Sequence, residues 1–172
     1  MALPFQSKEG RIHCSAGILA LLLLLPYRLI GQTIPPDREV LEKSEGGGMA
    51  MYADMNGYPG PKHVLDMVDQ LDLSDQQVND IQAIFDEMSE RARVKGKAII
   101  AREQELDDLF QSGKADQESV ERLSRDIGTM RGELRAIHLV AHVSAAQVLS
   151  AKQTEKYNAL RHGSHDPEMM HH

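Results

Sequence analysis

The chain has 172 residues, a formal net charge of −7 and few aromatic residues: three Phe, four Tyr and no Trp. This length allows one domain together with targeting and linker segments. Because the chain has no basic stripe with interleaved aromatic side chains, its composition excludes a nucleic-acid backbone as partner. The negative charge suits cationic partners, metal ions among them.

The first part of the chain, residues 1–31, carries the pattern of an export signal. Lys8 and Arg11 precede an uninterrupted apolar run over residues 16–25. This run is short for a membrane span of about 20 residues and is typical of a signal peptide. We therefore expect export to a bacterial periplasm, with the segment either cleaved or kept as an anchor in the inner membrane. The single cysteine, Cys14, precedes the run, so the exported part would lack disulfides and thiolate metal sites.

Residues 32–60 are rich in residues that interrupt regular structure, with two adjacent prolines and three adjacent glycines. This density predicts neither helix nor strand, so we expect a flexible leader. Met49, Met51 and Met55 offer thioethers that could collect a soft ion such as Cu(I). The alternative is a tether in which these methionines have no role.

The helical domain is predicted to cover residues 61–162. Pro61 suits the first turn of a short helix, and Ser74 with Gln77 forms a capping box for a long helix over residues 75–111. A helix of that length spans ~55 Å. Its apolar residues recur at steps of three and four, and they are Val78, Ile81, Phe85, Met88, Ala92, Ile99, Leu106 and Phe110.

A turn over residues 112–114 is predicted to lead to a second long helix, which Asp116 caps and which ends near Leu149. This helix has its own apolar stripe. Ala, Leu, Glu, Gln, Lys and Arg dominate this half of the chain, which also favours helix. The fold class is therefore all-α: an elongated antiparallel helical hairpin with a short helix at each end.

The last predicted helix begins after Ser150, which repeats the capping pattern with Gln153. Tyr157 and Leu160 give this helix its apolar side, and Gly163 is placed to stop it.

Three glycines are predicted to meet at one level of the hairpin. Gly96 faces Met130, which Gly128 and Gly132 flank. Each glycine costs ~1 kcal/mol relative to Ala inside a helix. The cluster indicates a close crossing of the helices or a bend at this level; the alternative is that the glycines are tolerated weak points on a solvated helix.

Two copies of L-S-x-x-Q, residues 73–77 and 149–153, bracket the hairpin. With the export signal, this combination resembles the Spy/CpxP family and its L-T-x-x-Q motifs, and the related periplasmic heavy-metal resistance and sensor proteins of the ZraP and CnrX type. The resemblance covers residues 57–161, and Ser in place of Thr keeps the capping chemistry.

The resemblance implies an all-α, dimeric, cradle-shaped periplasmic protein without catalytic activity. Some members of the family are ATP-independent chaperones that bind unfolded proteins. Others bind or sense Zn, Ni, Co or Cu and feed a stress response through a membrane signalling protein. The choice between these functions depends on the chemistry of individual residues.

His138 and His142 are four residues apart and share one face of the second long helix. Two neutral imidazoles at this spacing can bind a divalent transition metal. The hairpin register places Glu87 within reach, with Glu90 as a second choice. The alternative is that these are ordinary helix-surface histidines, with His138 at the border of the core or of a dimer seam.

His63 and Met67, also four residues apart, lie on the short helix before the hairpin. The metal-sensing relatives take ligands from the corresponding three helices. The resemblance thus implies a site of His63, Glu87, His138 and His142, to which Met67 could add a thioether. The alternative for Met67 is packing.

The C-terminal tail, residues 163–172, follows a helix stop and contains Pro167, so we expect it to be mobile. Mobile side chains gather ions but do not enforce a coordination geometry. We therefore assign an accessory metal-binding role to the end of the chain, carried by His162, His165, Met169, Met170, His171 and His172.

Catalysis and an organic cofactor are not expected. The HLVAH segment lacks the glutamate of H-E-x-x-H, and neither a phosphate-binding glycine loop nor a paired nucleophile is present. Charge pairs such as Arg131 and Arg135 are interpreted as solvated helix faces. The hypotheses are a metal-binding or metal-sensing protein, a chaperone for unfolded proteins, and a tethered structural hairpin without a ligand.

Overall fold

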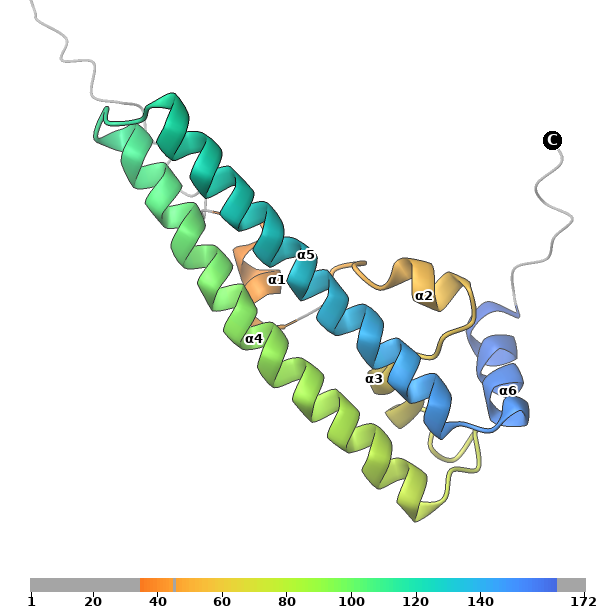
Figure 1. Ribbon diagram of the computed structural model, residues 1–172. Coiled ribbons are helices and arrows are strands. Elements are labelled where there is room, and N and C mark those ends of the chain that lie inside the picture. Colours follow the sequence, from red (N-terminus) through yellow and green to blue (C-terminus); the bar gives the residue numbers. More distant parts are fainter. Residues whose placement is uncertain (1–34, 45, 164–172) are drawn as a thin grey trace, which may run out of the picture. The chain divides into compact units, whose positions relative to one another are not determined.

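The computed structural model describes residues 35–44 and 46–163, and within them it contains helices and turns but no strand (Figure 1). The helices are α1 (Arg38–Glu42), α2 (Met51–Met55), α3 (Pro61–Leu65), α4 (Asp75–Gln111), α5 (Gln117–Val148) and α6 (Ala151–His162). The all-α prediction is confirmed. The predicted export segment and the tail after Gly163 lie outside the described residues. None of the helices that are described is long and apolar enough to cross a membrane.

Helices α4 and α5 form the predicted antiparallel hairpin, and they lie side by side in Figure 1. The Ser74 side chain accepts a hydrogen bond from the Gln77 amide, so α4 begins where the capping box predicts. Gly113 provides the left-handed conformation of the turn, with a φ of +67°. Asp116 then caps α5. Local capping chemistry therefore sets where each of the two long helices begins.

One part of the core joins α3, α4, α5 and α6 at the end of the hairpin away from this turn. Its buried residues are Val64, Leu71, Ile81, Ala145, Leu149 and Tyr157. Helix α3 ends at Leu65, and the chain then continues in turns up to Asp72. Two residues of the predicted apolar faces, Phe110 and Leu160, are exposed.

The prediction that residues 32–60 contain no helix was wrong. Helix α1 packs on the hairpin through Leu41, which is 1 % exposed, in a second cluster with Ala92, Ile99, Ile100 and Leu134. The prolines precede α1 and the glycines follow it, so these residues bound the helices of this segment instead of preventing them.

An ion-pair network also holds α1 on the hairpin. Arg131 donates to both carboxylate oxygens of Asp37, at 2.6 and 3.2 Å, and to Glu103 at 2.7 Å. The hydrogen bonds from Arg131 lower the pKa of Asp37 below its usual range. Arg131 is therefore a partly buried bridge between three elements and not part of a solvated face.

Gly96 marks a close approach, but to α1 and not to α5. A Cβ atom at Gly96 would lie 2.2 Å from the backbone oxygen of Leu41. At Gly128 and Gly132 a Cβ atom would meet nothing within 4 Å. Only the first of the three glycines is thus required by packing.

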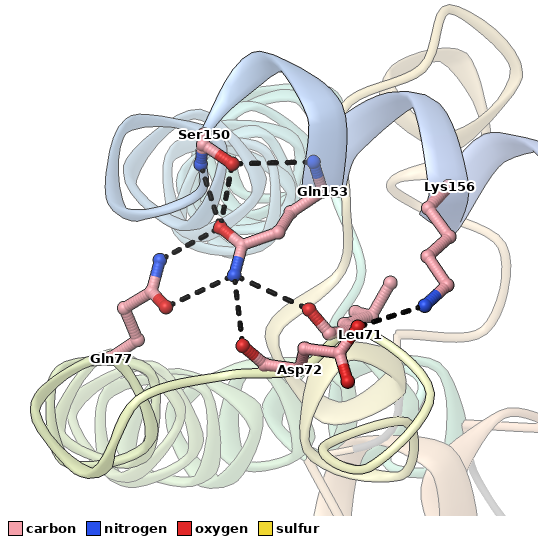
Figure 2. A network of polar contacts seen from close by, with 6 residues as sticks. All are labelled: Leu71, Asp72, Gln77, Ser150, Gln153 and Lys156. Carbon is pink, nitrogen blue, oxygen red and sulfur yellow. Dashed lines mark hydrogen bonds and ion pairs between the residues drawn. The ribbon is translucent and has the colours of Figure 1, made fainter.

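The two L-S-x-x-Q segments meet at the start of α6 (Figure 2). Gln77 donates to the Val148 carbonyl at 3.0 Å, and Gln153 donates to the Leu71 carbonyl at 3.3 Å. Lys156 adds an ion pair to Asp72. Through these contacts the motif glutamines, beyond capping their own helices, fasten α6 and the α3–α4 connection to the hairpin.

Candidate metal centre

A cavity of about 410 Å³ lies between α3, α4, α5 and the segment that joins α1 to α2. Three histidines line it: His63 from α3, and His138 and His142 from α5. Helix α4 contributes Phe85, Met88 and Ser89. The structure thus brings together the three histidines that the sequence singles out in the helical domain.

His138 is the most buried of the three, with 4 % of its surface exposed. Its Nε2 atom is buried and has no hydrogen-bond partner within the described part of the chain. Burial lowers the pKa of His138 below the usual 6.5, and repulsion from His142 adds to this. The neutral ring keeps a lone pair, and leaving a buried polar atom unpaired costs about 1–3 kcal/mol.

His142 has a defined tautomer because its Nδ1 atom lies 2.8 Å from the Tyr58 carbonyl oxygen. A carbonyl only accepts, so Nδ1 carries the proton and donates. In the neutral ring the lone pair is then on Nε2. That atom lies 3.2 Å from the position that a Cβ atom on Gly60 would occupy. Orienting a metal-binding imidazole by such a hydrogen bond is a common supporting contact.

His63 approaches the same place from α3. Its Cδ2 atom lies 3.4 Å from the Cβ position at Gly60, so the glycine leaves the space between the two rings open. Burial lowers the pKa of His63, and repulsion from Arg161 adds to this. His63 is therefore held towards its neutral form, as His138 is.

Tyr157 supports the backbone next to the rings, a role that sequence reasoning missed. The Gly60 amide donates to the Tyr157 hydroxyl at 3.3 Å, and that hydroxyl donates to Asp54 at 3.2 Å. Arg161 pairs with the other oxygen of Asp54. Since Tyr58 acts on His142 through its backbone carbonyl, its identity gave no sequence signal for this role.

Glu87 is not brought to the histidines. It pairs with Arg91 at 3.1 Å, its side chain is 70 % exposed, and it borders a separate, smaller cavity. The predicted register of α4 against α5 agrees with the structure to within one residue, because the neighbouring Met88 does line the histidine cavity. One residue along an α-helix, however, rotates the side chain by about 100°. Glu90, the second choice, pairs with Arg93 on an exposed face.

Met67 is also away from the cavity lining, and it packs partly buried against the core around Val64 and Tyr157. The remaining predicted ligands are the accessory residues at the end of the chain. His165, Met169, Met170, His171 and His172 lie outside the described residues, as does the side chain of His162.

Within residues 35–44 and 46–163, no three His, Cys, Asp or Glu side chains stand close enough to hold one metal ion. The donors of the cavity nevertheless fit a transition metal. They are imidazole nitrogens, one of them buried and unpartnered. A complete coordination shell would need side-chain adjustment or further ligands.

One of the comparisons with known proteins places the chain in a family. A family model described as heavy-metal resistance matches residues 46–156, well over half of the chain. The searches of curated proteins and of solved structures gave no significant match.

Proposed function

Because this chain belongs to the heavy-metal resistance family, as its resemblance to Spy/CpxP-like proteins predicted, we propose that it is an exported, non-enzymatic protein that binds a transition-metal ion. The ligands we propose are His63, His138 and His142. The observation that carries the proposal is the buried, unpartnered Nε2 atom of His138 in the cavity that the other two rings also line.

The electrostatics of the cavity support metal binding by imidazole. A metal ligand must be neutral imidazole, and protons compete for the same lone pair. Burial lowers the pKa values of His63 and His138, so protons compete less for the lone pairs of these rings than for those of an exposed imidazole. A bound Zn, Ni, Co or Cu ion would accept these lone pairs and remove the cost of the unpaired nitrogen.

The placement of the ligands supports a sensing role. His63 belongs to α3 and the other two histidines to α5, while the α1–α2 connection lines the cavity with Lys43, Ser44, Gly46 and Ala50. An ion that drew the rings together would change how this connection packs. We propose that a membrane stress-signalling protein in the periplasm reads the change, and that the protein acts as a homodimer.

Calorimetric titration of the full chain with Zn²⁺, Ni²⁺ and Cu²⁺ tests the metal site. The double variant His138→Gln with His142→Gln should lose the tightest binding event. The matched control, His171→Gln with His172→Gln, removes two imidazoles from the tail and should keep that event. Binding no tighter than millimolar, or equal in the two variants, would refute the proposal.

A second candidate function, binding of unfolded proteins, is favoured by a groove on the hairpin. It has a volume of about 550 Å³ and lies between α4 and α5. Its apolar wall includes the exposed Val94 and Val140, and its rim carries both signs of charge, with Lys95 paired to Glu133. Such a surface suits an extended apolar segment with flanking charges.

The aggregation of an unfolded client protein, followed by light scattering, tests this second function. The folded chain should suppress aggregation at near-stoichiometric ratio. The variant Val94→Ser with Val140→Ser should lose the suppression, whereas the histidine variants should keep it. Absence of suppression by the unaltered chain would remove this function and leave metal binding untouched.

A further inference from the structure

We propose that the histidine cavity prefers the soft monovalent ion Cu(I) over divalent ions, and that Met88 supplies a thioether ligand beside His138 and His142. This inference rests on the proposed function and names the class of ion that the same site takes. It follows from the residues that line the cavity and from the absence of Glu87 among them.

The cavity has no anionic lining among the residues that the structure describes. Neither Asp nor Glu lines it, and Glu87, the carboxylate expected there, pairs with Arg91 elsewhere. Two lysines, Lys43 and Lys62, lie at its edge. Their side chains are 56 % and 64 % exposed and pair with Glu39 and Asp66, so solvent screens their charge.

A neutral donor set discriminates between ions by charge. The cost of moving an ion out of water rises with the square of its charge, and neutral ligands do not cancel that charge. A divalent ion held only by imidazoles would need an anion from solution to balance it. A monovalent ion at the same atoms carries a smaller penalty, so the missing carboxylate favours Cu(I).

The side chain of Met88 is a type of ligand that suits Cu(I). It lines the cavity from α4, and His138 and His142 line the same cavity from α5. Thioether sulfur is a soft donor that selects Cu(I), while imidazole binds both Cu(I) and divalent ions. The flexible, unbranched side chain of methionine can also adjust to reach an ion. Met88 is therefore the residue that would separate Cu(I) from Zn²⁺ or Ni²⁺ at this site.

Competition titrations of the full chain test the preference. Cu(I) is added without oxygen in the presence of ascorbate and competes with the chromophoric chelator bicinchoninate. Zn²⁺ and Ni²⁺ compete with a chromophoric divalent chelator. We expect the cavity to bind one Cu(I) more tightly than either divalent ion. In Met88→Leu, Cu(I) affinity should fall by about 10-fold or more while Zn²⁺ affinity stays unchanged.

The matched control is Met130→Leu. Met130 is partly buried in the packing of α1, α4 and α5, so it tests the same change in volume away from the cavity. It should leave Cu(I) affinity unchanged, and circular dichroism should show both variants fully helical. The methionines and histidines of the tail are present in every variant, so the ions that they bind contribute equally to each titration.

The outcomes separate this inference from the proposed function. Tighter binding of Zn²⁺ or Ni²⁺ than of Cu(I), or equal Cu(I) affinities for Met88→Leu and Met130→Leu, would overturn the preference for Cu(I). If His138→Gln with His142→Gln still abolished divalent binding, the proposed function would stand. Failure of every ion to bind in the cavity would overturn both.

Discussion

The side-chain amides of Gln77 and Gln153 hydrogen-bond to each other in both directions, with nitrogen–oxygen distances of 2.9 and 3.1 Å (Figure 2). Each belongs to one L-S-x-x-Q segment, and 76 residues of sequence separate them. Each amide also closes its own capping box by accepting from the backbone amide of Ser74 or Ser150. The two copies of the motif therefore contact each other through their glutamine side chains.

Breaking this pair should destabilise the fold in a coupled way. We expect Gln77→Ala or Gln153→Ala to lower the free energy of unfolding by about 1–3 kcal/mol, because partly buried carbonyls lose their donors. Urea unfolding of both single variants and the double variant should give a coupling energy of about 0.5–3 kcal/mol. The exposed Gln82→Ala is the control. Additive effects of the two changes would contradict a direct contact.

Alanine substitutions at two glycines of the hairpin, Gly128 and Gly96, should have opposite effects on the packing and stability of the protein. Gly128→Ala should stabilise the protein by up to ~1 kcal/mol through helix propensity, because its Cβ atom would meet nothing nearby. Gly96→Ala should loosen α1, because its Cβ atom would collide with the Leu41 backbone. Hydrogen exchange at the α1 amides should be faster in Gly96→Ala alone. Equal stabilisation by both changes would refute the close approach.

Gly60→Ala should weaken metal binding without unfolding the protein. Gly60 has an ordinary φ of −75°, so alanine causes no backbone strain. Its Cβ atom would lie 3.0 Å from Cε1 and 3.2 Å from Nε2 of His142, in front of the proposed ligand atom. Calorimetry should show reduced affinity at an unchanged melting temperature. Gly48→Ala is unsuitable as a control because its φ is +79°, so Gly132→Ala serves instead.

Stability should fall as the solution becomes mildly acidic. His138 has a lowered pKa in the folded protein, whereas the unfolded chain titrates near 6.5. Below that pH the unfolded state takes up the proton first, so stability falls until the pH has passed the folded pKa. Urea unfolding from about pH 7 to about pH 5 should therefore show a shallower decline for His138→Gln than for the unaltered chain. Parallel declines would mean that His138 titrates normally.

Removal of residues 163–172 should lower metal capacity and spare the tightest site. The deletion begins at the C-cap of α6, beyond every residue that lines the histidine cavity. The number of ions bound at saturation should fall, while the highest affinity and the melting temperature stay unchanged. Loss of all measurable binding would place the site in the tail and refute an ordered centre.

The boundaries of the hairpin could be predicted from the sequence, because capping is a local matter. Ser74, Asp116 and Ser150 each cap a helix through a neighbour three residues along the chain. The register that pairs α4 with α5 followed from the position of the turn. It correctly placed the two histidines of α5 near the short helix α3.

Only tertiary structure decided what else surrounds those histidines. Helix α1 is five residues long and gains its place from the burial of Leu41 and the bridge by Arg131, which no local pattern encodes. Likewise, Glu87 was expected to face the cavity and Met88 does, because the rotation of a helix about its axis depends on packing. The chain alone determined that His63, His138 and His142 could meet; the folded packing determined that a thioether, and not a carboxylate, lies with them.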